Sequence, residues 1–111
     1  MITRLFGDHL QAQGNDQGVV SVRQLPKGTL MWSSEEQVGR HFQPVTVLSW
    51  SHDGRYLASG SSDATIKVWD AATGDLLQTY AEHTTEVYAL AWSPKDLMRR
   101  WRTSTDEKEL Y

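Results

Sequence analysis

The chain contains no cysteine. This absence excludes disulfide bonds, thiolate chemistry and every zinc site that needs cysteine ligands. The chain also lacks any run of about 18 apolar residues, the length that a membrane-spanning helix requires. The first thirteen residues lack the apolar segment of a signal peptide. The sequence therefore predicts a cytoplasmic protein with no membrane contact.

An excess of positive charge is also missing. The chain has 11 Lys and Arg against 14 Asp and Glu, so the net charge is −3. A protein that binds nucleic acid usually carries a basic surface, so no nucleic-acid partner is expected. The 111 residues fit one small domain, and 39% apolar residues with five Trp favour a packed core over disorder.

A repeat stands out when the sequence is compared with itself at an offset of 42 residues. Five positions between residues 41 and 51 then carry identical residues. The pairs are His41 and His83, Val45 and Val87, Leu48 and Leu90, Trp50 and Trp92, and Ser51 and Ser93. A period near 42 residues is typical of a supersecondary unit that stacks on its neighbours.

The best-defined repeat predicts four short strands joined by tight turns. The expected strands are Val45–Trp50, Arg55–Gly60, Thr65–Trp69 and Asp75–Tyr80. Successive side chains point to opposite faces of a strand, and these strands are apolar on both faces. Such a sheet is covered on both sides. The predicted fold class is therefore all-β, with antiparallel four-stranded blades stacked as an incomplete propeller, one blade complete and two in part.

The two ends of the chain match this pattern less well. At an offset of 46, Gly14 aligns with Gly60 and Gly28 with Gly74. This alignment predicts the last three strands of a blade at His9–Gln13, Val19–Arg23 and Thr29–Ser33. The pattern fades after Ser93. Residues 97–111 could form a degenerate hairpin, a frayed helix or a frameshifted end, and we expect an irregular or weakly helical segment.

The third predicted strand ends in Trp69-Asp70, and His41 precedes the first strand. Together with the stretch from Leu48 to Tyr80, these residues resemble the WD40-repeat propellers. On this resemblance, residues 1–38 are a degenerate partial blade, 39–80 a complete repeat, 81–96 the start of the next and 97–111 a degenerate tail. A closed propeller needs about four to eight blades. The chain is thus expected to be a piece of a longer protein, a truncated gene product or a subunit that self-associates.

The resemblance implies a structural tetrad of buried, hydrogen-bonded side chains. It maps onto Trp69, Ser59, His41 and Asp63. The indole N–H only donates, the hydroxyl both accepts and donates, and the imidazole links the hydroxyl to the carboxylate. In the first partial blade, the corresponding Trp, Ser and Asp positions carry Arg23, Gln13 and Gln17.

A catalytic interpretation of Ser59, His41 and Asp63 is the alternative, because the three residue types are those of a hydrolase triad. Ser59 lies within a predicted strand, however, and Trp69 would occupy its hydroxyl. We therefore expect no catalytic residue and no enzymatic activity. The histidines lack the spacing of metal ligands, so neither a metal nor a cofactor is expected. They are His9, His41, His52 and His83.

The resemblance implies a scaffold whose loops bind protein or peptide partners. The loops expected to do so are those before and after the strands at one end of the blades. Their residues are Arg40, Phe42, Gln43, Ser62, Glu82, Thr84, Thr85 and Glu86. The alternatives are small-ligand binding, for example of a carbohydrate, by an oligomeric propeller, or a gene fragment without function. Because outer blade faces would be apolar and uncovered, self-association is also expected.

Overall fold

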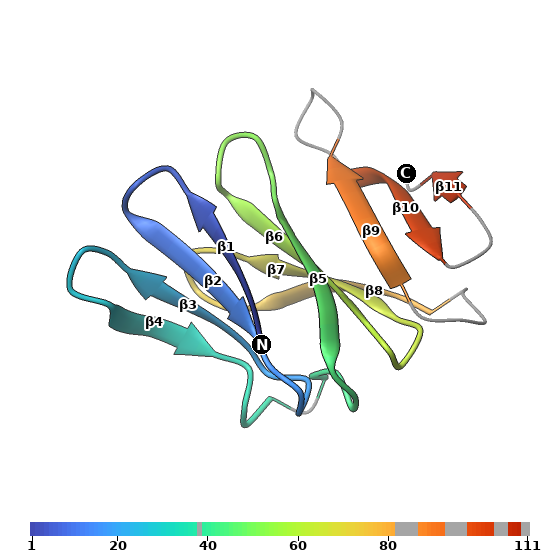
Figure 1. Ribbon diagram of the computed structural model, residues 1–111, viewed down its shortest axis with the longest axis horizontal. Coiled ribbons are helices and arrows are strands. Elements are labelled where there is room, and N and C mark those ends of the chain that lie inside the picture. Colours follow the sequence, from blue (N-terminus) through green and yellow to red (C-terminus); the bar gives the residue numbers. More distant parts are fainter. Residues whose placement is uncertain (38, 82–86, 93–97, 104–106, 110–111) are drawn as a thin grey trace.

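In the computed structural model, the residues that the structure describes form eleven strands in three antiparallel sheets (Figure 1). The structure describes residues 1–37, 39–81, 87–92, 98–103 and 107–109, with side chains in the first two ranges. The described residues contain no helix, and hence none that could cross a membrane. The predicted all-β class with four-stranded blades is confirmed.

The first sheet has four strands in sequential order, one more than the sequence predicted. They are β1 (Ile2–Phe6), β2 (Leu10–Gly14), β3 (Val20–Gln24) and β4 (Thr29–Ser33). The additional strand β1 pairs antiparallel with β2, from Ile2 opposite Gly14 to Phe6 opposite Leu10. The first blade therefore has its innermost strand as well as the three that were expected.

The second sheet agrees with the predicted meander to within one residue at each strand end. Its strands are β5 (Val45–Trp50), β6 (Tyr56–Ser61), β7 (Ile66–Asp70) and β8 (Leu76–Tyr80). The turn between β5 and β6 contains Gly54 at φ 74°, which glycine adopts without steric cost. In the turn between β6 and β7, Ala64 also has a positive φ, 67°.

The third sheet comprises β9 (Val87–Trp92), β10 (Met98–Thr103) and β11 (Glu107–Glu109). The strand expected at residues 87–92 has the bounds of β9. The expectation of an irregular or weakly helical tail does not fit the described residues, since 98–103 and 107–109 are strands. The charged β10 is extended because it pairs with β9 and β11, and such pairing overrides weak local propensity.

The three sheets are arranged so that β5 lies between β1 and β9, with the outer strands diverging from them (Figure 1). The core fills the space between the first and second sheets. It consists of Ala12, Val20, Val22 and Trp32 from the first sheet and Val45, Leu48, Leu57 and Trp69 from the second. Trp32 and Trp69 are 8% and 0% exposed, respectively.

The face of the first sheet that points away from the second sheet differs from the expected apolar surface. We call it the outer face and define it by Gln11, Gln13, Ser21 and Arg23, all half-buried. Strand pairing places Gln11 opposite Arg23 and Gln13 opposite Ser21, so the four side chains share one face. The expectation of an apolar outer face is wrong for this sheet.

Candidate functional site

The structure brings together the four residues of the proposed tetrad in one hydrogen-bonded chain. The Trp69 indole N–H donates to Ser59 Oγ at 2.9 Å, and His41 Nε2 lies 2.7 Å from the same oxygen. His41 Nδ1 lies 3.1 Å from Asp63 Oδ2. Since Ser59 Oγ accepts from the indole, its own proton is available for Nε2, and Nδ1 carries the imidazole proton toward Asp63.

Asp63 is the acceptor at the end of this chain. Besides His41, it accepts the backbone N–H of Phe42 at 3.0 Å and that of Thr65 at 2.9 Å. Partial burial on its own raises the pKa of the Asp63 carboxyl. The hydrogen bonds that the carboxylate accepts from His41, from the Thr65 hydroxyl and from the Phe42 N–H more than offset this effect, so the pKa lies well below its usual value.

A fifth side chain, Thr65, belongs to this network, and the sequence analysis did not identify it. Its hydroxyl donates to Asp63 Oδ1 at 2.5 Å and lies 2.9 Å from His41 Nδ1. The spacing Asp63-Ala64-Thr65 is a signal that could have found it, because an aspartate often accepts the N–H two residues later in a turn.

Burial limits what this arrangement can do chemically. His41 and Ser59 have no solvent exposure, and Ser59 Oγ is already engaged by both the indole and the imidazole. A nucleophilic serine must reach its substrate, so the Ser59, His41 and Asp63 grouping is closed to that chemistry. Its geometry instead joins the residues before β5 to the turn between β6 and β7.

Four of the expected partner-binding residues lie in the loops on either side of this network. Phe42 is 83% exposed, while its backbone N–H is held by Asp63. Ser61 Oγ donates to the Gln43 carbonyl at 3.0 Å, and the Ser62 N–H donates to the Pro44 carbonyl at 3.0 Å. These bonds tie residues 40–44 to residues 61–64, and we call the two segments the rim loops.

The first sheet supports the rim loops from the other side. Arg40 Nη1 donates to the Gln17 carbonyl at 3.2 Å, and the Val45 N–H donates to the Asn15 carbonyl at 3.0 Å. Gly18 has φ 83°, and a Cβ there would lie 2.3 Å from the His41 carbonyl oxygen. The close approach of the two backbones thus requires glycine at this position.

The remaining candidates are distributed elsewhere. The expected loop residues Glu82, Thr84, Thr85 and Glu86, like His83, lie outside the described residues. His9 is half-exposed beside Asp8, and His52 is exposed in the turn after β5. Over the part of the chain that the structure describes, no three side chains of metal-ligating type gather at one point.

The first sheet has its own pair at the positions that correspond to Ser59 and Trp69. Arg23 Nε donates to Gln13 Oε1 at 3.4 Å, and Arg23 Nη1 donates to the Gly28 carbonyl at 3.0 Å. Gln17 occupies the position that corresponds to Asp63, and its backbone carbonyl accepts a hydrogen bond from Arg40. The complete tetrad is therefore present in the second sheet, and a different polar pair takes its place in the first.

Comparison with known proteins points to one family. A family model described as the anaphase-promoting complex subunit 4 WD40 domain matches residues 8–95. The anaphase-promoting complex subunit cdc20 of Dictyostelium discoideum is 46% identical over 57 residues, which are 49% of this chain and 11% of that protein. The protein FIZZY-RELATED 2 of Arabidopsis thaliana is 44% identical over 54 residues, again 49% and 11%.

A longer match involves a probable cytosolic iron-sulfur protein assembly protein 1 of Cryptococcus neoformans. It is 37% identical over 75 residues, or 61% of this chain and 17% of that protein. The chain thus spans a small part of the curated relatives that it matches.

Solved structures with the same fold include the computationally designed proteins Ika4 and Ika8. Both superpose with a TM-score of 0.80 at 30% sequence identity over 96% of this chain. The matched part is 62% of the Ika4 chain and 31% of the Ika8 chain.

Proposed function

The chain belongs to the WD40-repeat family, and from this premise we propose that it is a non-catalytic scaffold that binds a protein or peptide partner through its rim loops. The observation that carries the proposal is Phe42, a large aromatic side chain that is 83% exposed on a backbone held by Asp63. Aromatic residues on ordered loops often dominate binding energy because few degrees of freedom are lost on binding.

The hydrogen bonds of the rim loops support this role. An exposed aromatic on a mobile segment would lose entropy when it docks, whereas residues 40–44 are tied to the second sheet through Ser61, Ser62 and Asp63. The tetrad then serves the scaffold indirectly, because it positions His41 and with it the neighbouring Phe42. Arg40, which is half-buried, adds a cation to the same rim loop, two residues before Phe42.

The names of the relatives support a protein partner without identifying it. One is named as a subunit of the anaphase-promoting complex and another as an assembly protein for iron-sulfur proteins. These names describe different assemblies, and the matched part is a small share of each protein. We therefore propose a protein or peptide partner and a cytoplasmic location.

A peptide selection tests the proposal. Peptides from a displayed library are selected on the intact chain, and their affinities are measured for the wild type, Phe42→Ala and Leu77→Ala. Leu77 is the matched control, because it is 49% exposed on β8, away from the rim loops. We expect Phe42→Ala to weaken binding about tenfold or more and Leu77→Ala to have little effect.

Thermal unfolding of the three proteins serves as the check on folding. Equal transitions are expected because Phe42 is mostly exposed. Selected peptides that bind wild type and Phe42→Ala equally well would contradict the assignment of the rim loops as the binding surface.

A further inference from the structure

The outer face of the first sheet carries different chemistry from the same face of the second sheet. At the 46-residue offset, its four defining residues correspond to a buried set of two apolar and two polar residues. That set is Leu57, Ser59, Lys67 and Trp69, each at most 7% exposed. In the second sheet, Leu57 and Trp69 belong to the core shared with the first sheet, and Trp69 packs on Trp32. The outer face instead presents two amides, a hydroxyl and a guanidinium.

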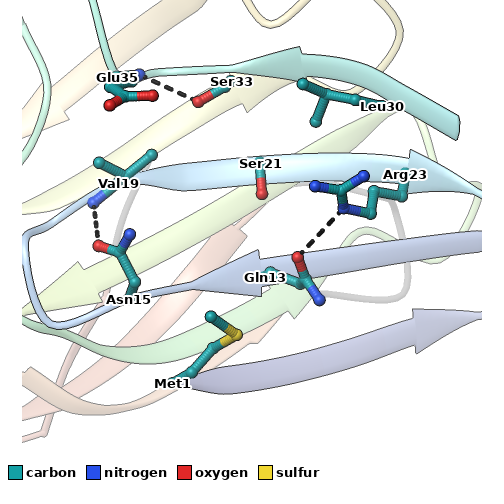
Figure 2. A pocket seen from close by; sticks show the side chains of 9 residues that line it. All are labelled: Met1, Gln13, Asn15, Val19, Ser21, Arg23, Leu30, Ser33 and Glu35. Carbon is teal, nitrogen blue, oxygen red and sulfur yellow. Dashed lines mark hydrogen bonds between the residues drawn. The ribbon is translucent and has the colours of Figure 1, made fainter. Parts of the chain in front are cut away.

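A hollow of about 240 Å³ opens on this outer face (Figure 2). Gln13 and Arg23 lie on one side of it, and Glu35 lies at the far end, beyond Ser21 and Val19 (Figure 2). The lining mixes polar groups with the apolar side chains of Met1, Val19 and Leu30, and its charged side chains, Arg23 and Glu35, are separated from each other.

Arg23 is the group that most needs a partner here. A guanidinium has five N–H donors, and within the described part of the chain Arg23 donates two of them, to Gln13 Oε1 and to the Gly28 carbonyl. Three donors remain on a half-buried cation. Any segment that covers this face would bury the charge, and a buried guanidinium is stabilised when a carboxylate accepts its N–H groups.

The other groups around the hollow also favour an acceptor. Asn15 uses its Oδ1 to accept the N–H groups of Gln17 and Val19, each at 2.9 Å, which leaves its amide nitrogen to donate. The Ser21 hydroxyl can donate as well. Glu35 at the far end disfavours a doubly charged anion, because like charges repel.

We propose that this hollow receives the carboxylate of an acidic side chain from a protein partner. The carboxylate would lie against Arg23, with Gln13, Ser21 and Asn15 as further hydrogen-bonding groups. This surface is separate from the rim loops, so the inference does not depend on the proposed function. The outer face would then bind its partner through a charged hydrogen bond, whereas the first and second sheets pack through aromatic rings.

The test is an NMR titration of the intact ¹⁵N-labelled chain with a blocked Gly-Glu-Gly tripeptide. The readout is the Nε–Hε resonance of Arg23, identified by its loss in Arg23→Gln. The blocked Gly-Gln-Gly tripeptide is the neutral control. We expect the Glu peptide alone to shift this resonance in a saturable way, with a dissociation constant in the millimolar range. Equal shifts with both peptides, or none, would overturn the proposal.

Gln13→Glu is the decisive variant, since it places a carboxylate of the chain itself at the atom that now accepts from Arg23 Nε. Binding of the Glu peptide should weaken about tenfold or more. Gln24→Glu introduces the same change on the next residue after Arg23, which points to the opposite face, and should leave binding intact. Unchanged binding by Gln13→Glu would contradict the site, and tryptophan emission, to which buried Trp32 and Trp69 contribute, reports whether each variant is folded.

Sodium acetate separates a peptide side chain from a free acid as the source of the carboxylate. We expect acetate to bind more weakly than the Glu peptide. Equal or tighter binding of acetate would overturn the assignment to a protein partner. Phe42→Ala should leave the titration unchanged, so this proposal and the rim-loop proposal can fail independently.

Discussion

Trp32 of the first sheet and Trp69 of the second pack with ring centroids 5.7 Å apart. The two sheets are also joined at this point by hydrogen bonds. The Trp32 indole N–H donates to the Ala71 carbonyl at 2.8 Å, and Gln37 Nε2 donates to the Gly74 carbonyl at 2.8 Å. Trp69 in turn donates to Ser59, so the contact between the sheets leads directly into the tetrad.

The contact depends on Gly74, which gives the first prediction. Gly74 has φ 80°, and a Cβ there would lie 2.6 Å from the Trp32 ring. Gly28 has nearly the same φ, 78°, and a Cβ there would have no atom within 4 Å, so Gly28→Ala tests backbone strain alone. We expect Gly28→Ala to lower the free energy of unfolding by about 1–2 kcal/mol and Gly74→Ala by a further ~1–3 kcal/mol. Urea unfolding measures both, and equal losses would show that the Trp32 contact tolerates a methyl group.

The second prediction concerns Asp63→Ala. The substitution removes the acceptor for His41, for the Thr65 hydroxyl and for two backbone N–H groups, some of them buried. The free energy of unfolding should fall by about 1–3 kcal/mol. Asp16→Ala is the control, because the Asp16 side chain is 88% exposed and its nearest ionic partner is the N-terminus at 3.9 Å. Similar losses for the two variants in urea unfolding would argue against a stabilising network.

The third prediction is the pH dependence of stability. The pKa of Asp63 in the folded chain lies below its ordinary value of 3.8, so at acid pH the unfolded chain binds more protons than the folded one. The stability that Asp63 contributes is therefore present above the ordinary pKa and is lost progressively as the pH falls below that value toward the lower pKa of the folded chain. Asp63→Asn should show a flatter decline between pH 5 and pH 2 in the same urea measurements. A decline as steep as that of the wild type would show that other carboxylates are responsible.

The fourth prediction tests what the polar outer face does to association. Self-association of the chain remains a prediction, and the outer face works against it, because Gln11 and Arg23 stand where the second sheet has Leu57 and Trp69. The double variant Gln11→Leu with Arg23→Trp restores the apolar pattern. Burial of apolar area between two copies is worth about 25 cal/mol per Å², which favours association. The mean mass of the double variant in sedimentation equilibrium should therefore exceed that of the wild type.

The matched control for this experiment is Gln24→Leu with Thr29→Trp, which adds the same side chains at two exposed, paired positions elsewhere on the sheet. It should sediment like the wild type. A double variant at Gln11 and Arg23 that is no larger than this control would contradict the role given to the outer face.

Strand positions were predictable where local pattern and turns agree. Val45–Trp50 and Thr29–Ser33 were predicted with the bounds that β5 and β4 have. Strand β1 was missed because Ile2–Phe6 carries exposed Thr3 and Arg4 and has little alternation, so its extended form depends on pairing with β2. For β10, a degenerate hairpin was one of the alternatives, but an irregular or weakly helical segment was expected, because pairing partners determine a charged strand more than its own composition.

The four residues of the tetrad could also be predicted from the sequence, whereas the neighbouring side chain that joins their network could not. Residue types and spacing singled out His41, Ser59, Asp63 and Trp69 because each position needs a specific donor or acceptor. Thr65 joins them only because the turn at Ala64 brings its hydroxyl to both Asp63 and His41.

By itself, the sequence determined the strand period, the repeat length and the family, because these follow from local alternation, turn residues and spacing along the chain. The tertiary structure alone decided which faces are covered. The offset at 46 residues already aligned Arg23 with Trp69, but only the packing shows that Trp69 lies against Trp32 while Arg23 lines an open hollow. The physical reason is that burial depends on which sheet is opposite, and a side chain's own identity does not specify its neighbour across an interface.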